Sequence, residues 1–379
     1  MRSNRHDLLR VDFPAHSLDP EPATTATATT AAPEVLEKLV QDAERVGASD
    51  IHLQRHGPTA DIAFRLDGVI APVTQLPAET AERVFGRIKY LARLKTYQDS
   101  MPQDGRIDRV ELKSQNDVRV ATYPTVRGEK IVLRLFNSAS TRTLGELDFS
   151  AATQTELENF LHQPAGMLLL TGPAGSGKTT TIYACLKSLV ELGGRHVITI
   201  EDPAEQIVPG VMQTEINEAR GLDFAKAARH LLRQDPQVLV IGEIRDDETA
   251  NLAVRAALTG HLVISTLHAG SCRGVLERLL VLCPDHSAVA ASVELILNQR
   301  LVRRLCAGCA GQGCSTCLKT GFHGRLPVLE TLRINDAMRR GIARHTLEEI
   351  SAKPSLVENA RSLVEAGLTN EPEIRRVLG

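Results

Sequence analysis

Residues 167–180 read Met-Leu-Leu-Leu-Thr-Gly-Pro-Ala-Gly-Ser-Gly-Lys-Thr-Thr. The apolar run predicts a buried strand, and residues 172–179 fit the pattern G-x-x-x-x-G-K-[S/T], whose backbone N–H groups can surround phosphates. The alternative is a glycine-rich turn that binds no ligand. Lys178 would carry positive charge to the outer phosphates, and the Thr179 hydroxyl would bind Mg²⁺. The sequence therefore predicts nucleotide binding by Gly172, Pro173, Ala174, Gly175, Ser176, Gly177, Lys178, Thr179 and Thr180.

The region around this loop alternates buried apolar strands with helices, which predicts parallel β-α units and an α/β fold. The expected strands are residues 167–170, 196–200, 238–241 and 262–264, and polar or charged residues follow each of them. Ligands of open α/β sheets bind at the carboxyl ends of the strands. We therefore expect the motifs beside these strands to gather around one phosphate site.

Three such motifs carry reactive side chains. Residues 200–205 (Ile-Glu-Asp-Pro-Ala-Glu) offer carboxylates that could polarise a water, and Glu243 follows four apolar residues, an arrangement that holds the water shell of Mg²⁺. His261 and His268 flank the fourth strand and could contact the outermost phosphate. Each motif alone also fits a plainer structure: a helix cap, a turn or a core histidine.

Composition limits the possible partners. The chain of 379 residues has a net charge of -2 and only 3% aromatic residues, which argues against nucleic acid as its main partner. The sequence has neither an apolar run of membrane-spanning length nor the apolar core of a secretory signal. We therefore expect a cytoplasmic protein of two or three domains.

The amino-terminal third predicts a separate small domain. Residues 20–33 are almost wholly Ala, Thr and Pro, so residues 1–33 are expected to form a disordered tail. Helices are expected at 35–46 and 78–94, strands at 51–53, 61–66, 69–73, 118–121 and 130–136, and turns at Asp67-Gly68 and Asp104-Gly105. This organisation gives a small α/β domain at 34–137, a linker at 138–144 and a nucleotide domain at 145–379.

Two Cys-x-x-Cys pairs lie close together near the carboxyl terminus. Cys306, Cys309, Cys314 and Cys317 could hold Zn²⁺ in a closed, structural site. Free thiols or a redox pair are the alternatives in the cytosol. Cys185, Cys272 and Cys283 are scattered and fit ordinary apolar positions.

Taken together, the residues of these motifs and their order along the chain resemble those of the secretion ATPase superfamily, specifically the type II secretion and type IV pilus assembly ATPases. The resemblance covers about nine-tenths of the chain and includes residues 48–52, 102–106, 119–130 and 232–236. It implies a RecA-like P-loop NTPase domain preceded by a small PAS-like α/β domain, with a tetracysteine zinc element (306–317) in the carboxyl-terminal region.

The resemblance also implies roles for particular residues. Glu205 matches the general base, Glu243 matches the acid that coordinates Mg²⁺ with Thr179, and His261 and His268 match a histidine pair. Arg119 and Arg134 match arginine fingers, which can act across a subunit boundary. An exposed strand face is the alternative for both arginines.

The implied function is a cytoplasmic, Mg²⁺-dependent ATPase that powers assembly of a type II secretion pseudopilus or type IV pilus. It would work as a homohexamer at the inner membrane face with ATP, Mg²⁺ and Zn²⁺. The chain resembles a short form that lacks an extra amino-terminal docking domain, so an inner-membrane platform protein would recruit it. The alternatives are a retraction or DNA-uptake motor, or a scaffold that binds nucleotide without hydrolysis.

The chain departs from the family pattern at two places besides its start. Ala174 stands where the phosphate loop of the family has threonine, but this position contributes mainly backbone, so we expect nucleotide binding to survive. Only four residues join the two cysteine pairs, where the family has a longer insert, and Gly311 and Gly313 would ease that reversal.

Overall fold

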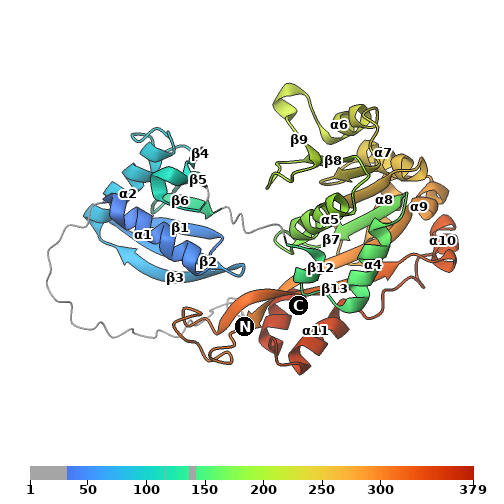
Figure 1. Cartoon of the computed structure of the whole chain (residues 1–379). Coiled ribbons are helices and arrows are strands. Elements are labelled where there is room, and N and C mark those ends of the chain that lie inside the picture. Colours follow the sequence, from blue (N-terminus) through green and yellow to red (C-terminus); the bar gives the residue numbers. More distant parts are fainter. Residues whose placement is uncertain (1–31, 116, 136–141) are drawn as a thin grey trace, which may run out of the picture.

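In the computed structural model of the protein, the described residues are 32–115, 117–135 and 142–379. They form two β-sheets with their helices, one from each part of the chain (Figure 1). The predicted tail lies outside the described residues except for its last two, because the first helix begins at Ala32. Most of the predicted linker also lies outside them.

The amino-terminal sheet is antiparallel throughout, with strand order β3-β2-β1-β6-β5-β4. Its apolar face packs against two amphipathic helices, and Ile51, Leu53, Ile62, Phe64 and Phe85 are almost completely buried there. The elements are α1 (Ala32–Arg45), β1 (Asp50–His56), β2 (Thr59–Leu66), β3 (Val69–Leu76), α2 (Ala78–Leu91), β4 (Gln103–Ile107), α3 (Arg109–Leu112), β5 (Val118–Thr125) and β6 (Gly128–Leu135).

One predicted turn of this part is confirmed and the other is wrong. Asp67 and Gly68 have φ of 49° and 85° and join β2 to β3 as a hairpin. Asp104 and Gly105 instead lie within β4 and pair with β5. A Cβ atom at Gly105 would lie 2.6 Å from the carbonyl oxygen of Ala92, so close backbone packing, not a turn, explains this glycine.

The second sheet is mostly parallel, with strand order β13-β12-β7-β11-β10-β8-β9, and only β13 is antiparallel to its neighbour. Its four predicted strands are confirmed, and their residues are buried on both faces, as a sheet covered by helices requires. The strands are β7 (Gly166–Thr171), β8 (Val197–Glu201), β9 (Val211–Glu215), β10 (Val238–Ile241), β11 (Leu262–Thr266), β12 (Val293–Leu305) and β13 (Phe322–Arg333).

Helices cover both faces of this sheet (Figure 1). Met167 and Leu169 of β7 belong to the core beneath α6, α7, α8 and α9, whereas Leu168 and Leu170 belong to the core beneath α4 and α5. The helical elements are η1 (Leu144–Glu146), α4 (Ala151–Leu161), α5 (Lys178–Leu192), η2 (Glu218–Arg220), α6 (Phe224–Leu231), α7 (Asp247–Leu258), α8 (Cys272–Leu282), α9 (His286–Ser292), α10 (Asp336–Ala343), α11 (Leu356–Glu365) and α12 (Glu371–Leu378). Among the described helices, we find none with the length and apolar character needed to cross a membrane.

A buried ion pair fixes α12 against β12. Glu373 is 1% exposed and accepts hydrogen bonds from Arg303 at 2.7 Å and from Arg376 at 2.6 Å. Burial alone would raise the pKa of Glu373, but these bonds outweigh it and lower the pKa to about 2. The carboxylate therefore stabilises the fold above its ordinary pKa, and this contribution is lost as the pH falls toward 2.

We expect Glu373→Gln to lower the free energy of unfolding at pH 7 by about 3 kcal/mol, because it leaves the partly buried guanidinium of Arg303 without its charged partner. Denaturant unfolding measures the change, with Glu371→Gln on the exposed start of the same helix as the control. The difference between wild type and Glu373→Gln should shrink as the pH is lowered. Equal unfolding free energies at pH 7 would contradict this account.

Candidate functional site

The phosphate loop connects β7 to α5 and packs tightly against β12. Gly172 has φ of 141°, and a Cβ atom there would lie 2.3 Å from the carbonyl oxygen of Gln299. Gly177 has φ of 90°, and its Cβ atom would lie 2.7 Å from Nε2 of the same glutamine. The two glycines are therefore required both by backbone conformation and by the approach of β12.

The side chains of this loop fit a phosphate group. The Nζ atom of Lys178 lies 2.8 Å from the carbonyl oxygen of Gly172 and 3.0 Å from that of Pro173, so the amino group stays at the loop. Burial lowers its pKa, and Arg300 adds to this effect while Glu243 opposes it. Ser176 is 3% exposed, and its hydroxyl has no hydrogen-bond partner in the described part of the chain. A phosphate oxygen would satisfy that hydroxyl.

Glu243 lies two residues after the end of the buried strand β10, and its charge acts on Lys178. Its carboxylate lies 2.8 Å from Nε of Arg245 and 3.1 Å from Nε2 of His268, which follows β11. The register of the parallel strands brings the carboxyl ends of β7, β10 and β11 to one edge of the sheet. Glu243, His268 and the phosphate loop thus lie at this edge, as expected.

His261 does not join them, which corrects the prediction that both histidines approach the phosphate. It precedes the amino end of β11, and its carbonyl oxygen accepts the N–H of Gly166 at the start of β7. The five residues of β11 span about 16 Å, so His261 lies at the opposite edge of the sheet from the loop. Its Nδ1 lies 2.9 Å from the carbonyl oxygen of Ala256, so the ring has a structural contact there.

Glu205 lies in the loop of residues 202–210 between β8 and β9, which we call the acidic loop. Glu205 is exposed on the surface, but partial desolvation of its carboxyl group raises its pKa, and the nearby charge of Glu201 raises it further. The charges of Arg134 and Arg119 act in the opposite direction. The charges of two arginines of the amino-terminal sheet thus act on Glu205 of the same chain.

Both arginines belong to a row of charged residues across the amino-terminal sheet. Arg106, Arg119, Arg134, Asp50 and Arg65 stand directly opposite one another on β4, β5, β6, β1 and β2, and we call them the arginine row. Asp50 is buried and accepts from Nε of Arg134 at 3.0 Å and lies 3.3 Å from Nε of Arg65. A cavity of about 550 Å³ has Arg106, Arg119 and Arg134 in its lining. A net positive row beside a cavity suits an anionic ligand.

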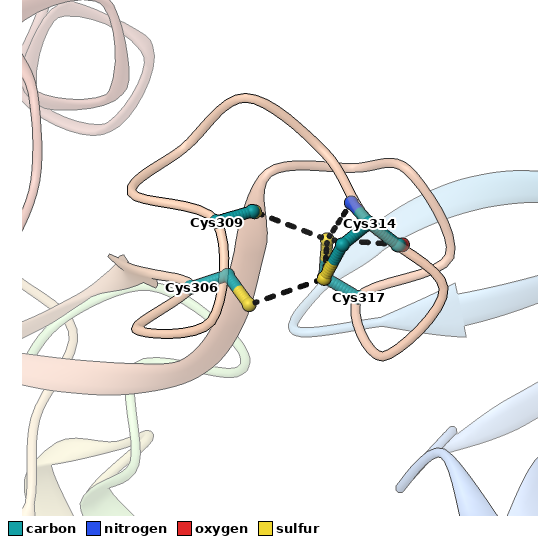
Figure 2. A group of neighbouring side chains, drawn as sticks. All are labelled: Cys306, Cys309, Cys314 and Cys317. Carbon is teal, nitrogen blue, oxygen red and sulfur yellow. Dashed lines mark hydrogen bonds between the residues drawn. The ribbon is translucent and has the colours of Figure 1, made fainter.

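The four predicted zinc ligands converge in the turn between β12 and β13 (Figure 2). All their sulfur atoms lie within 4.8 Å of one another, and the shortest separations are 3.7 and 3.8 Å. Zn–S bonds of about 2.3 Å give a tetrahedron with edges of about 3.8 Å, so the donor set fits Zn²⁺. The short connection between the pairs therefore does not prevent a four-thiolate arrangement.

Backbone groups around the cysteines favour thiolates. The N–H of Gly313 donates to Sγ of Cys309, and the N–H of Cys314 donates to Sγ of Cys317, both at 3.2 Å. Backbone hydrogen bonding at Cys317 lowers the pKa of Cys314 to about 6, whereas burial raises the pKa of Cys306 to about 11. Cys185, Cys272 and Cys283 are buried in the core, as predicted.

We expect the purified chain to contain about one Zn²⁺, held by the four thiolates. Cys309→Ser should lower the zinc content and the thermal stability together, while Cys185→Ser on α5 should leave the zinc content unchanged. Elemental analysis and thermal unfolding measure these effects. Wild-type protein that is purified without zinc, together with a Cys309→Ser variant of equal thermal stability, would contradict a structural zinc site. That result would favour free thiols.

Two residues hold the site together although the sequence carries no signal for their role. Gln299 accepts a hydrogen bond from Thr181 at 2.9 Å and supports the phosphate loop. Tyr183 contacts the acidic loop through its hydroxyl. No signal in the sequence links Gln299 to residues more than a hundred positions earlier, and Tyr183 fits the apolar pattern of a buried helix.

A parallel α/β sheet with a phosphate loop and two acidic motifs at its carboxyl edge defines the class of P-loop nucleotide-binding proteins. Within that class, the chain belongs to the type II/IV secretion system protein family, the secretion ATPases, whose model matches residues 26–376. This finding confirms the resemblance that the motifs indicated.

Curated relatives agree with this assignment. Type II secretion system protein E of Pseudomonas aeruginosa is 36% identical over 375 residues, which cover 90% of this chain and 74% of that protein. Type II secretion system ATPase E of Vibrio cholerae is 35% identical over 376 residues, which cover 91% of this chain and 75% of that protein.

Solved structures support the fold. The pilus retraction motor PilT with bound ADP aligns with a TM-score of 0.64 at 26% identity, over 89% of this chain and 95% of that one. The Legionella pneumophila ATPase DotB aligns with a TM-score of 0.68 at 20% identity, over 94% of this chain and 97% of that one. At 20% identity, the similarity to DotB concerns the fold alone.

Proposed function

We propose that the protein is an ATP hydrolase that uses Mg²⁺. The observation that carries this proposal is the meeting of the phosphate loop, Glu243 and His268 at one sheet edge. Lys178 would bind the outer phosphates, and Thr179 and Glu243 would hold Mg²⁺ and its waters. The bound ion would supply charge stabilisation to the transferred phosphoryl group.

Glu205 would act as general base on the attacking water. Its raised pKa moves it toward the range in which a carboxylate is an effective base near neutral pH. Arg119 and Arg134 would neutralise the charge that grows on the phosphates. The charges of both arginines act on Glu205 of the same chain, and such fingers can also act between neighbouring chains.

Family membership supports a proposal for the biological role. We propose a cytoplasmic homohexamer at the inner membrane face that powers assembly of a type II secretion pseudopilus or a type IV pilus. Residues 145–379 would be its RecA-like domain and residues 34–137 a PAS-like domain. A platform protein of the inner membrane would recruit it. The tetracysteine cluster favours assembly over the alternatives, a retraction or DNA-uptake motor, and zinc-free protein would favour those alternatives.

Steady-state phosphate release from ATP with Mg²⁺ tests the proposed activity. Wild-type protein should show saturable turnover, and Lys178→Ala should reduce it to background because the outer phosphates lose their charged partner. Background rates in wild type at every ATP concentration would instead favour a scaffold that binds nucleotide without hydrolysis.

A further inference from the structure

Tyr183 links the helix after the phosphate loop to the acidic loop. It lies on α5, five residues after Lys178, and is 3% exposed. The backbone N–H groups of Glu205 and Gln206 donate to its hydroxyl oxygen at 3.0 and 3.2 Å. One buried hydroxyl therefore accepts two consecutive backbone donors of the loop that carries Glu205.

The proton of this hydroxyl is committed to a different group. Oε2 of Glu201 accepts it at 2.5 Å, whereas the carbonyl oxygen of Gln206 is more distant at 3.4 Å. A phenol has one proton to donate and two lone pairs that accept, so these contacts use its full capacity. Burial and the bond to Glu201 also raise the pKa of Tyr183, so the hydroxyl remains protonated near neutral pH.

Glu201 fixes the hydroxyl from the side of the sheet. Its side chain is buried at the end of β8, and Oε1 accepts from Thr199 at 2.6 Å and from Gln213 of β9 at 2.9 Å. The tyrosine hydroxyl is thus held between α5 on one side and β8 and β9 on the other. Its position sets where the backbone of Glu205 lies.

We propose that Tyr183 is a positioning residue that holds Glu205 in place for hydrolysis and couples the phosphate-loop helix to the acidic loop. This inference rests on the proposed ATP hydrolysis. A shift of the phosphate loop moves α5, and the tyrosine transmits that movement to the backbone of Glu205. Tyr183 itself touches no reacting atom in this account.

The test is steady-state and binding analysis of Tyr183→Phe in the full chain. Removing the hydroxyl frees the N–H groups of Glu205 and Gln206 but leaves the ring in the core. We expect kcat to fall about tenfold to a hundredfold, as for a modest misplacement of a catalytic group, while the Kd for ATP changes less than about threefold. Cys185→Ala, another buried site on α5, is the control for general loosening of this helix.

A double-mutant cycle separates positioning from a purely structural role. In a Glu205→Gln background the general base is absent, so Tyr183→Phe should reduce the residual rate less than about twofold. A structural role would lower the rate by the same factor in both backgrounds. Equal losses in the two backgrounds, or an equal loss in Cys185→Ala, would overturn the proposal.

The activity of the wild type distinguishes failure of the positioning role from failure of the proposed function. If wild type hydrolyses ATP and Tyr183→Phe retains its full kcat, the positioning role is wrong and the proposed function stands. If wild type hydrolyses no ATP and Lys178→Ala matches it, the proposed function itself fails and the positioning role fails with it.

Discussion

Glu205→Gln is expected to lower kcat at least a hundredfold while ATP still binds with its wild-type affinity. The substitution keeps the shape of the side chain but removes the carboxylate that would take a proton from the attacking water, and general bases contribute about 10²- to 10⁴-fold. Phosphate-release kinetics and nucleotide titration measure the two parameters. Glu191→Gln, an exposed change at the end of α5, is the control.

The dependence of kcat on pH tests the role of Glu205 in a second way. A general base acts when deprotonated, so kcat should fall as the pH decreases through the pKa of Glu205, which partial desolvation and the charge of Glu201 raise above the ordinary glutamate value. Glu205→Gln should lose this acid limb. A variant that keeps both the wild-type rate and the wild-type pH profile would exclude Glu205 as the base.

Arg119→Ala should lower kcat by about 10²- to 10³-fold, the range for removal of one donor that stabilises charge in a transition state. Arg119 is preferred to Arg134 for this test because Arg134 also pairs with the buried Asp50. Replacing Arg134 would therefore reduce stability as well as activity.

Arg83→Ala is the matched control for Arg119→Ala, because Arg83 lies on the surface of α2 in the same part of the chain, where it pairs with Glu79 of the same helix. Steady-state kinetics with thermal unfolding separates catalytic loss from unfolding. Wild-type turnover in Arg119→Ala would show that Arg119 belongs to a solvated strand face, the alternative that its sequence also allows.

Local sequence predicts much of this fold. The four parallel strands are continuous apolar runs, and such runs are distinctive because the sheet is buried on both faces. The Asp67-Gly68 hairpin carries its own turn signal. β9 and β12 were not predicted, because β9 is only half-buried and β12 contains polar residues such as Asn298 and Gln299.

Long-range contacts account for what the sequence could not provide. Gly105 is a glycine because of a contact with Ala92, and nothing near it in the sequence distinguishes that need from a turn. His261 and His268 look equivalent in the sequence, but strand direction places them at opposite ends of β11.

The central claim is that the chain cleaves ATP with Glu205 as the base. A single-turnover experiment that identifies the nucleotide bound to the protein tests this claim most directly. Wild type and Glu205→Gln would each be loaded with limiting ATP and Mg²⁺, and the bound nucleotide identified over time. The account predicts ADP on wild type and intact ATP on Glu205→Gln. Conversion to ADP at equal rates on both proteins would contradict it.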